Sequence, residues 1–451
     1  MEGRTKQIII IIAVIAVYAG IVSALYSEII DTTIIDQRQD SELIVPVSLE
    51  SNIPLDEDNP IKVGILHSLS GTMATSETPL VDSVLLAIDE INERGGVLGR
   101  KIVPIVADGK SDWDVFASEA EKLIVEEKVS AIFGAYTSAS RKAILPIFEK
   151  YNHLLFYSVV YEGLEQSPNI IYLGAAPNQR FIPALDWVVE NLGTRIFLVG
   201  TDYVYPRSVN EIIKHRANEL GVEIVGEEYR ILGDQDFSEI IEKIVETNPD
   251  VIISSVVGES NIPFYNELRR RGVEPHIIPT VMVNDSSLFD ISKEMSSQTL
   301  NMVGDYAALN YHWFLDLPEN IEFIQNFKNK YGSQSFISDP IQASHSAVYL
   351  FEKAVQKAGS DDVNEIRQAV IGLTLAAPEG VIGIDPETQH SFKHFRIAKI
   401  IEKNSIKIIH SSEEPIKPIP YPKYKSEEEW EVYLKDLYDG WDQSWSNLGD
   451  E

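Results

Sequence analysis

The chain contains no cysteine among its 451 residues. This absence excludes disulfide bonds, thiolate metal sites, a cysteine nucleophile and lipid attachment through an N-terminal cysteine. Basic residues are also scarce, because 38 Lys and Arg stand against 69 Asp and Glu, for a formal net charge of −31. A nucleic-acid-binding protein needs a basic face, so this balance argues against nucleic acid as a partner.

The sequence motifs of the common enzyme mechanisms are missing as well. There is no G-x-S-x-G elbow, no P-loop, no H-E-x-x-H and no G-x-G-x-x-G that opens a helix. The nine histidines show no metal-ligand spacing. Glu162 and Glu165 lie in a turn before Ser167-Pro168 and are expected to cap backbone groups or face water. We therefore predict a receptor with no catalytic residue, no metal and no cofactor.

The first 59 residues divide into three parts by composition. Residues 1–7 carry two basic residues and are predicted to be cytoplasmic, since such residues flank the inner end of a membrane segment. Residues 8–25 are apolar and just long enough to span a bilayer, which predicts a membrane anchor. A cleaved signal peptide is the alternative, because Val22-Ser23-Ala24 fits the small-residue cleavage pattern. Residues 26–59 are acidic without sustained periodicity, which predicts a linker.

From Ile61 onward, apolar strand-like runs alternate with amphipathic helical patterns. The strand-like runs include residues 61–67, 101–108, 129–134, 195–200, 222–229, 250–258 and 276–283. This alternation predicts an α/β protein with two mostly parallel sheets, each flanked by helices on both faces. After about Gly383 the pattern becomes strand-rich, and residues 395–411 are predicted to form an antiparallel hairpin at a sheet edge.

Three of the predicted strands end in loops that carry tyrosine and hydroxyl side chains. The residues in question are Tyr136, Thr137 and Ser138, then Tyr157 and Ser158, and finally Tyr203 and Tyr205. The carboxyl ends of parallel strands share one edge of a sheet, where ligands bind in open α/β folds. The first two loops contain no Lys, Asp or His, so we predict half of a cleft for a small neutral polar molecule. Tyr203 and Tyr205 are two apart and in an extended turn would point to opposite sides, one toward the ligand.

Longer strings in the same region resemble a known family. They are ILHSLSGTMATSET (65–78), TSASRKAILPIFEKYNHLLFY (137–157), YEGLEQSPNIIYLGAAPNQ (161–179), GTDYVYPR (200–207) and APEGVIGIDPETQHSF (377–392). These strings are similar to type I periplasmic binding proteins, in the branch of the urea receptor of the urea ABC transporter and of a bacterial amide sensor. The resemblance implies two α/β lobes, joined by three crossings, that close on a ligand by hinge motion. It implies an N-terminal lobe of residues 60–174 and 308–375 and a C-terminal lobe of residues 175–307 and 376–422.

The same resemblance assigns ligand-binding residues by position. On one lobe the matching residues are Tyr136, Ser138, Tyr157 and Val159, and on the other they are Tyr203 and Tyr205. The serine hydroxyl and backbone N–H groups would serve a carbonyl oxygen, while tyrosine rings enclose a planar molecule. Glu259 is the implied acceptor for ligand N–H groups, and Asp305 is a weaker candidate. The branch often has Tyr-Pro where this chain has Tyr157-Ser158, and the change removes a rigid backbone constraint.

These expectations combine into one functional hypothesis. The chain is predicted to be a membrane-tethered extracytoplasmic receptor that captures urea or a short-chain amide and delivers it to an ABC transporter permease. If residues 8–25 are cleaved, the same receptor is periplasmic or secreted. One alternative is a urea or amide sensor that feeds a separate signalling protein. Another is an amide hydrolase, which would need a base beside Ser138, and no histidine stands in the neighbouring loops.

The chain ends in a predicted amphipathic, acidic helix at residues 423–451. Ser426 and Glu429 have the spacing of a capping box, and aromatic residues as far as Trp441 and Trp445 recur at helical spacing. The helix is predicted to pack onto the folded body. Docking to a permease or to a membrane surface is the alternative.

Overall fold

The computed structural model describes residues 56–273, 276–279, 304–333, 335, 337–402, 405–447 and 449. They belong to one compact unit, Ile53–Glu451. The predicted anchor at 8–25 and the linker up to residue 55 lie outside the described residues, so both stay predictions. Within the described ranges, no helix combines the length and apolar character that a bilayer crossing requires.

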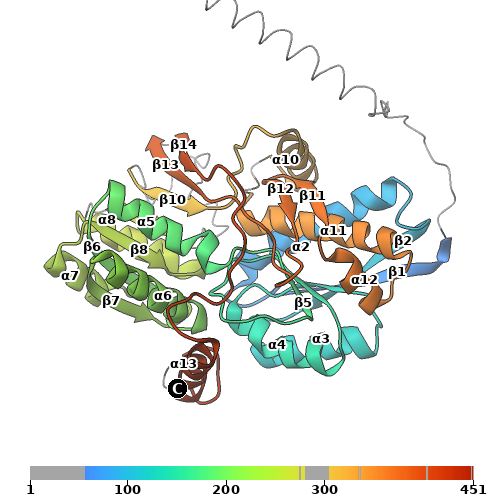
Figure 1. The fold of residues 1–451 in the computed structure, drawn as a ribbon, viewed down its shortest axis with the longest axis horizontal. Helices are drawn as coiled ribbons and strands as arrows, with labels where there is room; N and C mark the ends of the chain where they lie inside the picture. The colour runs from blue at the N-terminus through green and yellow to red at the C-terminus, as the bar shows by residue number, and fades with distance from the viewer. Residues whose placement is uncertain are drawn as a thin grey trace, which may run out of the picture. The chain divides into compact units, whose positions relative to one another are not determined.

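A five-stranded parallel sheet, in the order β2-β1-β3-β4-β5, forms the centre of the first lobe (Figure 1). Its strands are β1 (Asp56–His67), β2 (Arg100–Asp108), β3 (Ile132–Gly134), β4 (Leu155–Tyr157) and β5 (Ile170–Tyr172). Successive residues point to opposite faces, so Ile132 and Phe133 enter different cores. The Ile132 face is covered by α3 (Trp113–Val125) and α4 (Ser138–Lys150). The Phe133 face is covered by α2 (Ala74–Glu93), α11 (Asp339–Ala358) and α12 (Val363–Val370).

The second lobe contains a four-stranded parallel sheet in the order β7-β6-β8-β9. Its strands are β6 (Arg195–Thr201), β7 (Glu223–Arg230), β8 (Val251–Ser255) and β9 (His276–Pro279). One face packs against α5 (Phe181–Asn191) and α6 (Val204–Leu220), and the other against α7 (Ser238–Thr247) and α8 (Asn261–Arg270). Single-turn helices η1 (Pro177–Gln179) and η2 (Gly258–Ser260) precede α5 and α8. An antiparallel sheet of β10 (Tyr306–Leu309), β13 (Arg396–Glu402) and β14 (Ser405–Ser411) completes the lobe.

This architecture confirms the predicted α/β fold of two parallel sheets flanked by helices and the antiparallel hairpin at 395–411. The chain passes between the lobes after β5, after β10 and after the hairpin of β11 (Thr374–Ala377) and β12 (Gly380–Gly383). That hairpin packs with α10 (Pro318–Tyr331) and α11, and Ile382 lies in the core of the first lobe. The third passage therefore follows Ile384 rather than residue 375, because a two-residue turn holds β12 against β11.

The C-terminal helix, α13 (Glu427–Gly440), packs against α6 and buries Trp430 completely. The predicted capping box is confirmed, because the Glu429 N–H donates to Ser426 Oγ at 3.2 Å and the Ser426 N–H donates to Glu429 Oε2 at 2.7 Å. The helix ends at Gly440, so Trp445 is not part of it, contrary to the prediction from helical spacing.

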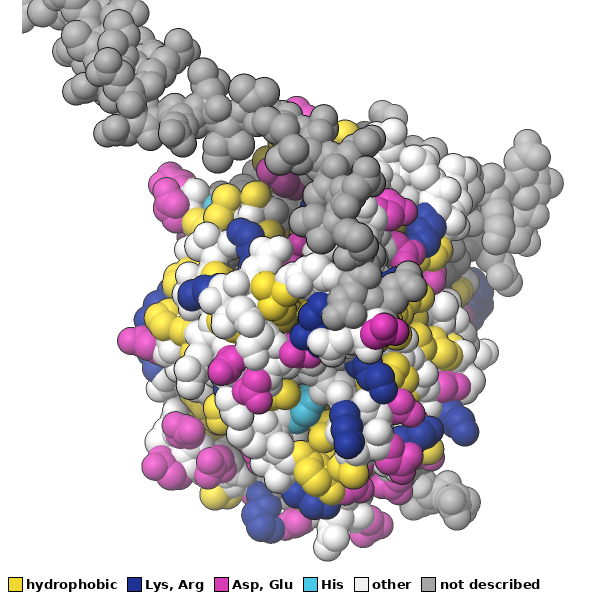
Figure 2. Space-filling model, turned by 90° about the vertical axis from the view of Figure 1, so that its right-hand side faces the viewer, with side chains coloured by type: hydrophobic (Ala, Val, Ile, Leu, Met, Phe, Trp, Pro, Cys, Tyr) yellow, Lys and Arg dark blue, Asp and Glu magenta, His cyan; other side chains and the backbone are white. Residues whose placement is uncertain are grey.

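The excess negative charge does not gather on the face that Figure 2 shows. Lys and Arg side chains there are interspersed with Asp and Glu side chains, and the hydrophobic side chains form small groups. Charge on this face therefore favours solubility more than it selects a partner.

Candidate ligand-binding site

The first predicted loop begins helix α4 at the carboxyl end of β3. Thr137 is the N-cap, and its hydroxyl accepts a hydrogen bond from the Ser140 N–H at 3.0 Å. Tyr136 stands just before this cap and Ser138 just after it, and all three side chains are buried. An N-cap fixes where a helix starts, so Thr137 sets the positions of both neighbours.

The second predicted loop, residues 157–159, leaves β4 directly beside the first. The Tyr157 hydroxyl donates a hydrogen bond to the Tyr136 carbonyl at 2.9 Å, which joins the two loops. Gly174 permits the close backbone approach that this loop needs, since a Cβ atom there would lie 1.8 Å from the Val159 carbonyl oxygen. Ser158 and Val159 are buried in the same loop.

The third predicted loop lies in the second lobe, where Tyr203 is the N-cap residue of α6 and Tyr205 belongs to its first turn. Their ring centroids are 6.0 Å apart with the planes inclined by 32°. The expectation that they point to opposite sides is wrong, because the chain is already helical from Val204. Burial raises the pKa of the Tyr203 hydroxyl, and nearby Tyr205 and Tyr157 raise it further. The two lobes therefore bring their predicted tyrosines together.

Glu259, predicted as an acceptor from the second lobe, lies in η2 after β8. Its side chain is outside the described part of the structure, so its role stays a prediction. Asp305 is buried and pairs with Arg269 through its Oδ2 atom, while its Oδ1 accepts from the Ile277 N–H at 3.2 Å. Both carboxylate oxygens thus have partners within the second lobe.

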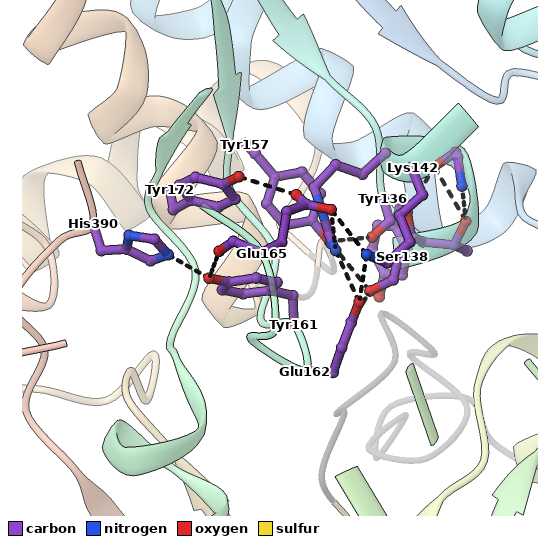
Figure 3. A network of polar contacts seen from close by, with 12 residues as sticks. Tyr136, Ser138, Lys142, Tyr157, Tyr161, Glu162, Glu165, Tyr172 and His390 are labelled. Carbon is purple, nitrogen blue, oxygen red and sulfur yellow. Dashed lines mark hydrogen bonds and ion pairs between the residues drawn. The ribbon is translucent and has the colours of Figure 1, made fainter. Parts of the chain in front are cut away.

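A buried charge network adjoins the tyrosines, and it was not expected from the sequence (Figure 3). Arg141 donates to Glu162 Oε1 at 2.9 Å and to Glu165 Oε1 at 2.7 Å. Lys142 donates to Glu165 Oε2 at 3.0 Å. Because these four side chains are buried, the prediction that both glutamates cap backbone groups or face water is wrong. Two basic residues at the start of α4 hold the glutamates inside, where each would otherwise be a costly unpaired charge.

The network also determines what Ser138 can do. Its hydroxyl donates to Glu162 and accepts from Arg141 Nη1 at 3.1 Å. The serine proton is therefore directed at a carboxylate in this structure. The role that the resemblance implies for Ser138, a hydrogen bond to a ligand carbonyl, stays a prediction. Further donors of this loop are the Tyr136 hydroxyl and the backbone N–H groups of the first turn of α4 other than that of Ser140, since a helix leaves its first N–H groups without internal partners.

Aromatic rings pack against the network. The Arg141 guanidinium lies 4.8 Å from the ring centre of Tyr157 and 4.7 Å from that of Tyr161. Burial acts to raise the pKa of Glu165, but the Arg141 and Lys142 cations outweigh it and lower that pKa to about 2. His390 stacks on Tyr172 with centroids 4.1 Å apart, and burial lowers its pKa to about 4.

Two charged residues near Tyr136 were missed by the sequence analysis. Glu77 on α2 accepts from His67 Nδ1 at 3.0 Å and from the Ser68 N–H at 2.9 Å, both through Oε2. Glu77 Oε1, the Tyr136 hydroxyl, and Nε and Nη2 of Arg180 are buried with no hydrogen-bond partner among the residues described. Burial raises the pKa of Tyr136, and Glu77 and Arg180 are among the charges close enough to influence it. The sequence did contain a signal for Glu77, because it is a charged residue on the inward face of a helix that is mostly apolar there.

Arg180 follows η1 at the first passage between the lobes and is 2% exposed. Its Nη1 atom lies 3.9 Å from Asp339 Oδ2. Burial lowers the pKa of the guanidinium, although Tyr205 and Asp339 act in the opposite direction. The site therefore combines tyrosine rings from both lobes with buried donor and acceptor atoms that have no partner among the described residues.

Comparison with known proteins identifies the family of this chain. The family model described as "Periplasmic binding protein domain" matches residues 61–427. "Leu/Ile/Val-binding protein homolog 6" of Brucella melitensis is 21% identical over 352 residues, which cover 75% of this chain and 87% of that protein. The "Leucine-, isoleucine-, valine-, threonine-, and alanine-binding protein" of Pseudomonas aeruginosa is 22% identical over 329 residues, which cover 72% and 86%.

Solved structures show the same fold. A solute binding protein of an ABC transporter from Rhodopseudomonas palustris BisB5, in complex with 3,4-dihydroxybenzoic acid, matches with a TM-score of 0.70 and 22% identity over 80% of this chain and 99% of its own. The branched-chain amino acid transporter substrate binding protein LivJ from Streptococcus pneumoniae, in complex with isoleucine, has a TM-score of 0.66 and 20% identity, covering 78% and 99%. Because the family model spans nearly all of the folded body, the chain belongs to the periplasmic binding protein domain family and is a binding protein rather than an enzyme, as the sequence predicts.

Proposed function

We propose that this protein captures urea or a short-chain aliphatic amide between its two lobes and delivers it to an ABC transporter permease outside the cytoplasm. The observation that carries the proposal is that the four charged side chains of the buried network beside the tyrosines compensate one another. Arg141 and Lys142 pair with Glu162 and Glu165, and all four are buried. This network offers no unpaired counter-charge to an ion, and Glu77 and Arg180 nearby carry opposite charges, so the site favours a ligand without net charge.

The unpartnered atoms near Tyr136 suit the two ends of an amide. Glu77 Oε1 is an acceptor for a ligand N–H, and Arg180 Nε and Nη2 are donors for a ligand carbonyl. Flat tyrosine rings from both lobes suit a small planar molecule, which presents its faces to rings and its edges to hydrogen bonds. Urea and acetamide carry N–H donors and a carbonyl acceptor in one plane, so both match this set.

A second candidate is a zwitterionic amino acid, and the same two residues favour it. Glu77 would face an ammonium group and Arg180 a carboxylate, and the relative from Pseudomonas aeruginosa is named for binding amino acids. Urea remains the first choice because the buried tyrosines that enclose the site come from both lobes and carry hydroxyl groups. An aliphatic side chain would have to pack against those hydroxyls.

Isothermal titration of the unit Ile53–Glu451 against urea, acetamide, formamide and leucine tests the proposal. We expect binding of urea or an amide and weaker binding of leucine. Glu77→Gln should weaken urea binding by about tenfold to a hundredfold, the usual loss for a hydrogen bond to a charged group. Glu90→Gln, on the same helix but bonded to His345 and Tyr349, is the matched control and should bind normally. Binding of leucine alone would refute the proposal.

The tether is part of the same proposal. Residues 8–25 would anchor the chain in the membrane and residues 26–59 would carry the folded body away from it. Deleting residues 8–25 should release soluble protein with unchanged ligand affinity, as measured by fractionation and titration. Insolubility of the deleted form would show instead that the segment belongs to the fold.

A further inference from the structure

After α13 ends at Gly440, the chain returns toward the tyrosine site. We call residues 441–447 the C-terminal strap. Its backbone meets the start of α6, where the Trp445 carbonyl accepts from the Val204 N–H at 3.0 Å and Ser446 pairs with Tyr203 in an isolated β-bridge. The Asn447 N–H donates to the Asp202 carbonyl at 2.9 Å, and its side chain donates to Asp202 Oδ2 at 2.8 Å.

These contacts supply a cap that α6 lacks. The first N–H groups of a helix have no partner inside it, and a serine, threonine or aspartate at the N-cap usually accepts one of them. Here the N-cap is Tyr203, which makes no side-chain cap hydrogen bond. The Trp445 carbonyl takes that place at Val204. The strap therefore holds in position the turn that carries Tyr203 and Tyr205.

The strap also contacts the first lobe. Trp113, the first residue of α3, donates from Nε1 to Ser446 Oγ at 3.1 Å. The Lys142 ammonium of the buried network lies 4.9 Å from the Trp445 ring centre. Ser446 is buried and Trp445 is half-buried, so the contacts are shielded from water. Hinge opening of a two-lobed protein would have to break the contacts to one of the lobes.

The attachments to the two lobes are unequal. On the second lobe the strap has three hydrogen bonds and continues from α13, which packs against α6. On the first lobe, among the residues that the structure describes, it has one hydrogen bond, from Trp113, and the ring contact with Lys142. The weaker side should release first, so the strap stays on α6 when the lobes separate.

We propose that the C-terminal strap is a latch that fastens the first lobe to the second when the lobes close over a ligand. Ser446 is a positioning residue, since it joins Tyr203 of one lobe to Trp113 of the other. The latch depends on the proposed function only for the choice of urea as the probe. It sets how long a ligand stays bound and leaves the contacts of the ligand itself unchanged.

Ser446→Ala and Trp113→Phe each remove the bond between the strap and the first lobe. Each should speed urea dissociation by about twofold to tenfold, the range for one neutral hydrogen bond. The double variant should be no faster than the single ones, because both remove the same bond. Ser446→Thr keeps the hydroxyl and should restore the slow rate, and Ser118→Ala, on the exposed side of α3, is the matched control.

A second measurement follows closure itself without any ligand. The chain has no cysteine, so Glu126→Cys on the first lobe and Glu246→Cys on the second give unique positions for a fluorescence energy-transfer pair. Ser446→Ala and Trp113→Phe should lower the closed fraction while the thermal unfolding of the ligand-free protein stays the same. A merely structural role would lower the unfolding temperature instead and leave urea dissociation unchanged, which would overturn the latch.

The two proposals can fail separately. If the unmodified protein does not bind urea, the proposed ligand is wrong, and the closed fraction alone decides the latch. A lower closed fraction in both variants would then support it. An unchanged closed fraction would refute it.

Discussion

Replacing Arg141 by methionine removes the cation that two buried carboxylates share. Arg141 is fully buried and hydrogen-bonded to Ser138, Glu162 and Glu165, and methionine keeps much of its length without its charge. Lys142 then remains as the counter-charge, 3.0 Å from Glu165 but 3.9 Å from Glu162. Breaking a buried ion pair from one side costs about 3–5 kcal/mol of folding free energy, because an uncompensated charge stays inside.

The loss should depend on pH in a direction that identifies its cause. In the unmodified protein the pKa of Glu165 is about 2, against 4.5 as the ordinary value, so its stabilisation is complete above pH 4.5 and disappears only as pH falls toward 2. In Arg141→Met a carboxylate has lost its cation, and its pKa rises. Protonation then relieves the unpaired charge, so the difference in stability between the two proteins should be larger at pH 7.5 than at pH 5.

Guanidinium chloride unfolding at several pH values measures this difference, and guanidinium is used because urea is the proposed ligand. The double variant Arg141→Met/Glu162→Gln should lose less than the sum of the single variants, since one change removes the charge that the other leaves unpaired. Lys150→Met, on the same helix but in an exposed pair with Glu121, is the control and should change little. A loss that is small, or equal at pH 5 and pH 7.5, would refute the view that the network is charged and buried.

Tyr136→Phe removes a buried hydroxyl that has no protein partner within the described ranges. The free energy of unfolding should stay the same or rise while urea affinity falls, measured by guanidinium unfolding and by titration. Gly174→Ala places a Cβ 1.8 Å from the Val159 carbonyl oxygen and should cost about 1–3 kcal/mol or more, whereas Gly440→Ala meets no atom and should be tolerated in the same unfolding assay. Burial lowers the pKa of His390 to about 4 from 6.5, so as the pH falls the histidine is protonated first in the unfolded chain. The free energy of unfolding should therefore be unaffected by His390 above pH 6.5 and should fall by about 3 kcal/mol as the pH drops to 4. The unfolding midpoint is measured as a function of pH in both proteins. If it falls as steeply between pH 6.5 and 4 in His390→Phe as in the unmodified protein, this assignment is wrong.

The positions of Tyr136 and Tyr157 could be predicted because they follow from general properties of a parallel sheet. Apolar runs located β3 and β4, and the carboxyl ends of adjacent parallel strands must meet at one edge. The 2.9 Å hydrogen bond from the Tyr157 hydroxyl to the Tyr136 carbonyl is the direct consequence. The capping box of Ser426 and Glu429 was predictable for the same kind of reason, since its spacing is local.

Contacts between segments that are distant along the chain could not be predicted from any local pattern in the sequence. Arg141 and Glu165 are separated along the chain by a strand and a turn, and no spacing rule connects them. Glutamates before a Ser-Pro pair usually face water, so their burial depended on cations of α4 that only the fold brings near. Trp445 fitted the helical spacing of α13, but the helix ends at Gly440 and the chain turns toward Tyr203 instead.

The pairing within the network explains how a site rich in charged residues can suit an uncharged ligand. An isolated carboxylate beside the tyrosines would attract a cation, and an isolated guanidinium would attract an anion. Arg141 and Lys142 pair with Glu162 and Glu165 in a buried cluster of two cations and two carboxylates, and the two cations lower the pKa of Glu165 to about 2. The buried polar atoms at the site that have no partner among the described residues belong instead to other residues near Tyr136, and we assign ligand recognition to those atoms. The network therefore acts on ligand choice indirectly, because it connects the start of α4 to the loop of Glu162 and Glu165 while adding no net charge.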